Sequence, residues 1–126
     1  MRLSLTDQQS LIPHAKIVRY GADEVVEFAG EVPSAMSFLI RGSVRLTTTA
    51  DDGAVLSVSV LEAGSFLGLT TLTRQPSLTT VYALEEVTAM EIDREHIEDL
   101  VMRSPLLLQE LGRIIEDRRK RVDRMA

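Results

Sequence analysis

Short runs of apolar residues recur at spacings of about ten residues along most of the chain. Such runs predict β-strands over residues 15–20, 24–29, 36–41, 43–49, 55–61, 78–83 and 87–92. The segments between the runs contain glycine, proline, aspartate and serine, which favour turns. Because no helical pattern separates the runs, they predict a mainly β protein, built as an antiparallel sandwich or jelly roll.

The run VLSVSVL at residues 55–61 shows the strictest alternation of apolar and polar residues. Successive side chains of a strand point to opposite faces. We therefore expect Leu56, Val58 and Val60 to share a buried face, with Ser57 and Ser59 on the other.

Helical patterns are confined to the two ends of the chain. Residues 5–13 follow a capping-box pattern and predict a short N-terminal helix. Asp93 is a suitable N-cap for a helix that ends at about Met102. Ser104 and Pro105 then favour the start of a last helix.

The last helix carries a stripe of residues at alternating spacings of three and four. Its members are Leu108, Leu111, Ile115, Arg118, Val122 and Met125. Two interpretations stay open. The apolar members can form the seam of a weak homodimer, with one charged residue inside it, or they can pack on the β domain of the same chain.

Composition indicates one ordinary globular domain. The chain has 126 residues, of which 44% are hydrophobic and 26% charged, and it has no cysteine. The absence of thiols excludes disulfides and cysteine-ligated metals and fits a reducing, cytoplasmic compartment. No apolar run is long enough to span a membrane. We expect a soluble cytoplasmic domain, on its own or as part of a membrane-bound parent protein.

The charge of the chain is unevenly distributed. Residues 1–104 contain 8 basic and 15 acidic residues, whereas residues 105–126 contain 6 basic and 4 acidic ones. An acidic body is a poor surface for nucleic acid, so no direct nucleic-acid contact is expected. The cluster RRKR at 118–121 is read first as a solvated helix end and second as a contact for an anionic partner.

No arrangement of residues favours catalysis, so the chain is not expected to be an enzyme. The two histidines, His14 and His96, lie outside the predicted strands, and neither has the neighbours of a metal site. Nucleophile-elbow and phosphate-loop motifs are absent. A catalytic cupin-like barrel is accordingly the weakest interpretation.

The order of the predicted elements and several short motifs together resemble the cyclic nucleotide-binding domain family. These motifs are YGAD at 20–23, GE at 30–31, FLIRGSV at 38–44, LEAGSFLG at 61–68 and TVYA at 80–83. The resemblance implies a β-roll, or double-stranded β-helix, over residues 15–92. It also implies an N-terminal helix within 1–14 and C-terminal helices within 93–126, all in one domain over residues 1–126.

The resemblance also places the phosphate-binding cassette of the family in the stretch GSFLGLTTLTRQPSLTTVYA at 64–83. In the family, a glutamate follows the glycine that matches Gly68 and accepts the ribose hydroxyl, and a later arginine pairs with the cyclic phosphate. Here Leu69 and Ser77 occupy those positions. Losing both interactions costs about 3–6 kcal/mol, which weakens binding by roughly 10² to 10⁴.

The candidate ligand-binding residues that remain are those of the altered cassette. They are Gly68, Leu69, Thr70, Thr71, Arg74, Ser77, Leu78 and Thr79. Backbone amides at 68–72 and the threonine hydroxyls can hold an anion. Arg74 is either a replacement cation or an exposed loop residue. We expect Leu69 to turn inward, against Leu78 or Phe38, and to close the pocket. The alternative is an open cavity lined by free amides near Thr70 and Thr71, which would favour an anionic ligand.

Two functions follow from the resemblance. The first is a non-catalytic regulatory module that binds cyclic AMP or cyclic GMP weakly, or another small anion, and serves an effector domain of a larger bacterial protein. A channel and a transcription regulator are both compatible with this role. The alternative is an interaction or dimerisation scaffold that has lost its ligand.

Overall fold

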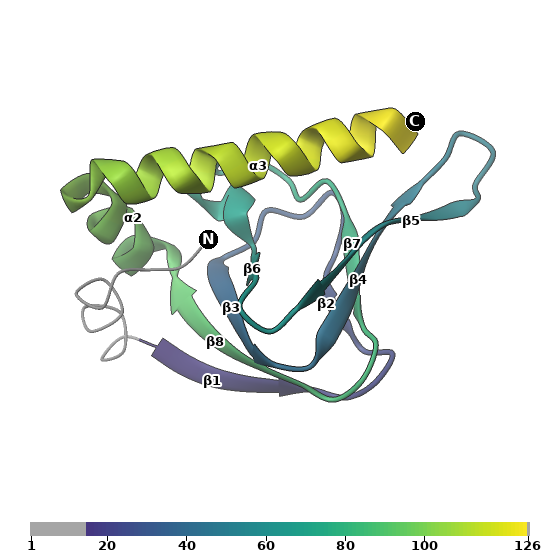
Figure 1. Cartoon of the computed structure of the whole chain (residues 1–126), viewed down its shortest axis with the longest axis horizontal. Helices are drawn as coiled ribbons and strands as arrows, with labels where there is room; N and C mark the ends of the chain where they lie inside the picture. Colours follow the sequence, from purple (N-terminus) through teal and green to yellow (C-terminus); the bar gives the residue numbers. More distant parts are fainter. Residues whose placement is uncertain (1–14, 126) are drawn as a thin grey trace.

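Two antiparallel four-stranded sheets form the body of the molecule in the computed structural model, which describes residues 15–125 (Figure 1). One sheet has the order β1-β8-β3-β6 and the other the order β2-β7-β4-β5. Together they form the roll that the apolar runs predicted. The helix expected over residues 5–13 lies outside the described residues.

The strands follow the predicted runs closely. They are β1 (Ala15–Tyr20), β2 (Val25–Glu27), β3 (Ala35–Arg41), β4 (Ser43–Thr49), β5 (Val55–Glu62), β6 (Phe66–Leu67), β7 (Thr80–Ala83) and β8 (Val87–Asp93). The two-residue strand β6 was not predicted, because two residues are too few to show a period. It pairs with Ser37 and Phe38 of β3.

A bulge changes which face of β5 is buried. Leu46 and Thr47 of β4 pair with Ser59 and Ser57, so Val58 is an extra residue on the β5 side. An extra residue reverses the faces that follow it. Val60 is consequently 45% exposed and Leu61 half-buried, and the expectation that Val60 shares the buried face is wrong.

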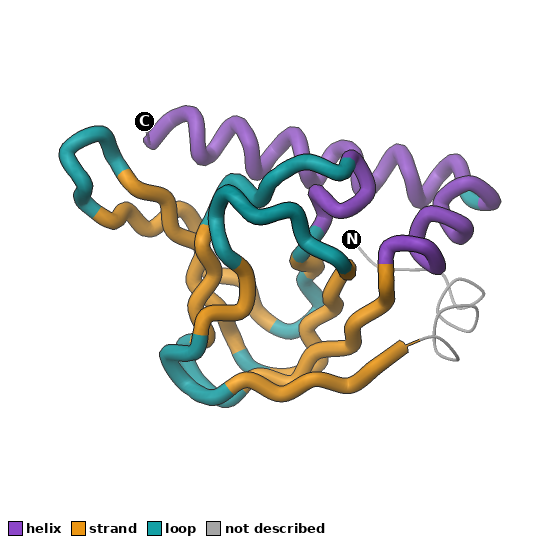
Figure 2. The backbone as a smooth tube through the Cα atoms, turned by 180° about the vertical axis from the view of Figure 1, so that it is seen from behind, coloured by secondary structure: helices purple, strands orange, loops and turns teal. Residues whose placement is uncertain are grey.

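Two helices follow the strands and lie along one end of the roll (Figures 1 and 2). Helix α2 spans Arg94–Arg103, and helix α3 spans Pro105–Met125. The side chain of Asp93 accepts a hydrogen bond from the amide of His96, which confirms the predicted N-cap. Helix α3 begins at Pro105, as Ser104 and Pro105 indicated.

The core has two parts. One lies inside the roll and contains Leu39, Val44, Leu46, Leu67, Val81, Ala83, Val87 and Ala89. The other lies between the roll and the helices and contains Met36, Phe66, Leu69, Ile92, Ile97, Leu100, Val101, Leu107 and Leu111. This second part fixes α2 and α3 against the altered cassette.

Candidate functional site

Gly68 begins the cassette and approaches β3 closely. Its φ is +70°, in the left-handed region, and a Cβ at this position would collide with the carbonyl oxygen of Ala35. Any other residue would have both an unfavourable backbone conformation and a steric clash at this position. This close approach of the backbone at Gly68 brings the cassette against the start of β3.

A short 3-10 helix, η2 (Leu69–Thr73), follows Gly68. Its first residue, Leu69, is only 4% exposed and belongs to the core beneath α2 and α3. Phe38 packs on the same core, whereas Leu78 is 40% exposed. Leu69 therefore turns inward as expected, into the core on which Phe38 packs, and it acts as a core residue.

The cassette is nevertheless not closed. A cavity of about 400 Å³ lies between it and α3. On the roll side, the cavity is lined by Glu27, Gly68, Leu69, Thr70, Ser77 and Thr79. The expectation that Leu69 closes the pocket is wrong, because its side chain fills the core below the cavity and leaves the space beside Thr70 open.

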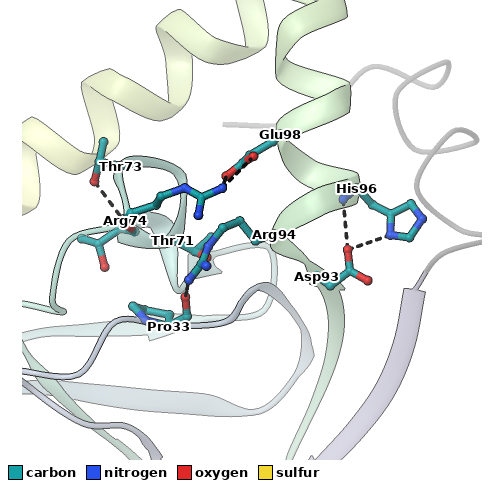
Figure 3. Close-up of polar contacts among 9 residues, drawn as sticks. Pro33, Thr71, Thr73, Arg74, Asp93, Arg94, His96 and Glu98 are labelled. Carbon is teal, nitrogen blue, oxygen red and sulfur yellow. Dashed lines mark hydrogen bonds and ion pairs between the residues drawn. The ribbon is translucent and has the colours of Figure 1, made fainter.

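Two of the candidate residues lie away from this cavity, on the side of η2 that faces α2 (Figure 3). Thr71 is fully buried, and its hydroxyl accepts a hydrogen bond from Nε of Arg94 at 3.0 Å. Arg74 forms an ion pair with Glu98 at 3.2 Å. Both side chains fasten the cassette to α2, and Arg74 is not positioned as a replacement cation.

Ser77 stands where the family has its arginine, and its hydroxyl contacts Glu27 of β2. The same hydroxyl lies 2.9 Å from the carbonyl oxygen of Thr79. A serine hydroxyl has one proton, so it can donate to only one of these two acceptors.

The environment of Glu27 shifts the protonation equilibrium of its carboxyl. Burial raises the pKa of the Glu27 carboxyl above its usual value, although hydrogen bonds from Ser77 and the Gly68 amide and the charge of Arg118 act in the opposite direction. Glu27 thus occupies the amide of Gly68 and the hydroxyl of Ser77. An anion held by the cassette would use these same donors.

Arg118 of α3 lines the opposite side of the cavity. Loss of solvent around the guanidinium lowers its pKa to about 10, while the charge of Glu27 partly restores it. Arg118 was read as part of a solvated basic helix end, and that interpretation is wrong for this residue. The rest of the cluster does face solvent, where Arg119 pairs with Glu116 and Arg121 with Asp117.

Sequence reasoning missed Glu27 and Arg118 as site residues, although both left a signal. Glu27 interrupts the apolar run VVEFA at 25–29, and Arg118 interrupts the apolar stripe of α3. A charged residue within an apolar pattern is rarely buried without a partner. The two interruptions mark residues that need polar surroundings, but they do not show that both residues face one cavity.

The middle members of the predicted stripe also face the roll. Leu111 is fully buried, Ile115 packs on the core, and Val122 lines the cavity. Leu108 and Met125 are 50% and 38% exposed. The second interpretation, packing within the chain, therefore holds for the middle of the helix.

Comparisons with known proteins agree with this geometry. The sequence profile described as "Cyclic nucleotide-binding domain" matches residues 17–104. The chain belongs to this family. The matched segment contains the roll, the cassette and α2, and it ends just before α3.

Two curated relatives are transcriptional regulators. The chain is 28% identical over 119 residues to the cAMP-activated global transcriptional regulator Vfr of Pseudomonas aeruginosa, covering 90% of this chain and 56% of Vfr. It is 24% identical over 121 residues to the cAMP-activated global transcriptional regulator CRP of Haemophilus influenzae, covering 91% of this chain and 54% of CRP. The chain spans about half the length of these relatives.

A solved structure with the same fold is the Thermus thermophilus catabolite activator protein. Its TM-score to this chain is 0.81 at 20% identity, over 96% of this chain and 57% of that one. This likeness supports the β-roll followed by two helices.

No helix within residues 15–125 is long and apolar enough to cross a membrane. The same described part of the chain holds no group of three or more side chains suited to a metal ion.

Proposed function

We propose that this domain is the ligand-sensing part of a larger regulatory protein, and that its ligand binds in the cavity between the cassette and α3. The cavity itself carries this proposal. Its volume of about 400 Å³ suits a small ligand, and it has polar groups on both the roll and the helix sides. The two cAMP-activated relatives support a nucleotide as the ligand and a transcription regulator as the parent protein.

Binding of cyclic AMP or cyclic GMP is weak or altered in this proposal. Leu69 belongs to the core and has no carboxylate for a ribose hydroxyl, and the hydroxyl of Ser77 is already used by Glu27. A ligand must therefore bind without the two side-chain interactions that the family resemblance implies. The loss corresponds to about 3–6 kcal/mol if nothing replaces them.

Calorimetric titration with cyclic AMP and with cyclic GMP tests the proposal directly. We expect dissociation constants in the micromolar to millimolar range, together with a rise in the midpoint of thermal unfolding. The matched control is Val58→Trp, which places a large side chain at the cavity wall and should abolish the heat if binding occurs there.

A scaffold without a ligand is the second candidate, and one observation favours it. Thr71, Arg74 and Arg94 bind the cassette to α2 and to the loop before β3 without any ligand (Figure 3). Absence of heat and of thermal stabilisation with both cyclic nucleotides would support this candidate. A weak homodimer through the exposed ends of α3 is compatible with either function.

A further inference from the structure

The amide and hydroxyl donors of the cassette are already in use. The carboxyl of Glu27 contacts the hydroxyl of Ser77 and the backbone amide of Gly68. An entering anion would have to displace Glu27 and leave a buried carboxyl without these partners, which is unfavourable. This end of the cavity is therefore poorly suited to a phosphate.

The other side of the cavity has a cation that forms no ion pair or hydrogen bond within residues 15–125. Arg113, Arg119 and Arg121 of α3 each form an ion pair with an acidic residue of the same helix. Arg118 forms no ion pair or hydrogen bond among the described residues, although it is largely withdrawn from solvent. Its five N–H donors remain available for a planar or tetrahedral anion.

Thr70, a residue of the same cavity wall, has a buried hydroxyl without a hydrogen-bond partner among the described residues. Oγ1 of Thr70 is inaccessible to solvent and makes no hydrogen bond within residues 15–125. Buried polar groups are normally satisfied, so an unpaired one beside a cavity indicates a missing partner. Thr70 and Arg118 are thus two residues of one cavity wall whose side-chain polar groups have no hydrogen-bond partner within residues 15–125.

We propose that the cavity holds the anionic group of its ligand at Arg118 and Thr70, whereas Glu27 keeps the donors of Gly68 and Ser77 occupied. This inference rests on the proposed function in that it uses the same cavity. The ligand is a small phosphorylated compound. Its phosphate points towards α3, and its hydroxyl groups can donate to Glu27 at the other end.

A phosphate group would supply hydrogen-bond acceptors for Arg118 and Thr70. A guanidinium binds two phosphate oxygens in parallel, and such charge-assisted pairs are stronger than neutral ones. The arginine absent from position 77 is thereby replaced from α3 instead of from the cassette. Because Arg118 belongs to α3, the ligand would also couple the roll to this helix.

The test uses the described domain in its full 126-residue chain and follows nuclear magnetic resonance signals during titration with inorganic phosphate, cyclic AMP and adenosine. We expect phosphate and cyclic AMP to shift the Nε–H signal of Arg118 and the amide signal of Thr70, and to leave Nε–H of Arg119 unchanged. Adenosine, which has no phosphate, should not shift the Arg118 signal.

Variants separate the two ends of the cavity. Arg118→Gln should weaken cyclic AMP binding at least tenfold and change adenosine binding less than twofold, whereas the control Arg119→Gln should change neither. Glu27→Ala should let phosphate reach Gly68, so that the amide of Gly68 begins to shift. Glu27→Gln keeps the side chain in place and should not have this effect.

The outcomes distinguish this inference from the proposed function. If cyclic AMP does not bind but phosphate still shifts Arg118 and Thr70, the nucleotide proposal fails and the inference stands. If the unmodified chain shows shifts at Gly68 and Ser77 and none at Arg118, or if neither phosphate nor cyclic AMP affects Arg118, the inference is wrong.

Discussion

Gly68 shows how one residue can be required for two separate reasons. Its left-handed backbone disfavours a side chain, and Ala35 of β3 occupies the space that a Cβ would need. Gly64 also has a positive φ, +96°, but nothing lies within 4 Å of a Cβ at that position. The two glycines therefore separate backbone strain from steric collision.

Gly64→Ala should lower the free energy of unfolding by about 1–2 kcal/mol, the usual cost of a left-handed non-glycine residue. Gly68→Ala should cost about 2 kcal/mol more, because the cassette must also move away from β3. Chemical denaturation of both variants measures the difference. Equal losses would mean that the contact with Ala35 relaxes freely.

Glu27 makes stability depend on pH in a direction opposite to that of most carboxylates. Its folded-state pKa is raised, so the folded protein binds the proton more tightly than the unfolded chain does. The stabilisation is fully present below the unfolded pKa of about 4.5 and is lost as pH rises through the folded value. The charged groups around Glu27 are Arg118 across the cavity, and Glu31 and Glu91 in a smaller cavity behind it.

Glu27→Gln removes this titration while keeping a polar side chain of the same size. We expect the variant to gain stability over the unmodified chain as pH is raised from 4.5 towards neutrality, and the gain to disappear at lower pH. Denaturation midpoints of both proteins across this range provide the measurement. A gain that grows as pH falls would contradict a raised pKa.

At the scale of whole elements, strand positions could be predicted from the sequence because alternation is a strong local signal. Strands β1 and β4 match the predicted runs residue for residue. The bulge at Val58 could not be predicted, since it depends on how β5 pairs with β4. The faces of α3 were ambiguous for a similar reason, because a stripe of residues does not say whether its partner is another chain or the same one.

The site was predictable only in part. The position of the cassette and the loss of its two charged residues followed from the family resemblance, and Leu69 was correctly expected to turn inward. Arg118 lies 41 positions after Ser77 in the sequence and reaches the cavity only because Leu107 and Leu111 fasten α3 to the second core. Contacts of this kind depend on tertiary packing rather than on local pattern.

The desolvated guanidinium of Arg118 should therefore lower the free energy of unfolding, and ligand binding should offset this loss. Arg118→Met removes a desolvated cation without an ion pair and should raise the free energy of unfolding by about 1–2 kcal/mol in phosphate-free buffer. Arg119→Met, at a solvent-facing position, should change it by less than about 0.5 kcal/mol. A loss of stability in Arg118→Met would show instead that this guanidinium is a structural element of the fold.

For the whole molecule, the open question is whether α3 also joins two copies of the chain. The apolar stripe was expected to offer Leu108, Leu111, Ile115, Val122 and Met125 to a partner. Only its two ends are substantially exposed, at Leu108 and Met125. A dimer formed through this stripe must use those ends, because the middle of the stripe packs on the roll.

Leu108 and Leu111 lie within one turn of each other and make a matched pair for testing this. Leu111→Ala should lower the free energy of unfolding by about 2–5 kcal/mol, because it creates a cavity in the second core. Leu108→Ala should lower it by less than about 1 kcal/mol and should instead weaken self-association, which sedimentation over a concentration series measures. If the unmodified chain is monomeric at every concentration, or if Leu108→Ala associates as strongly as the unmodified chain, then α3 serves the single domain and does not join two copies.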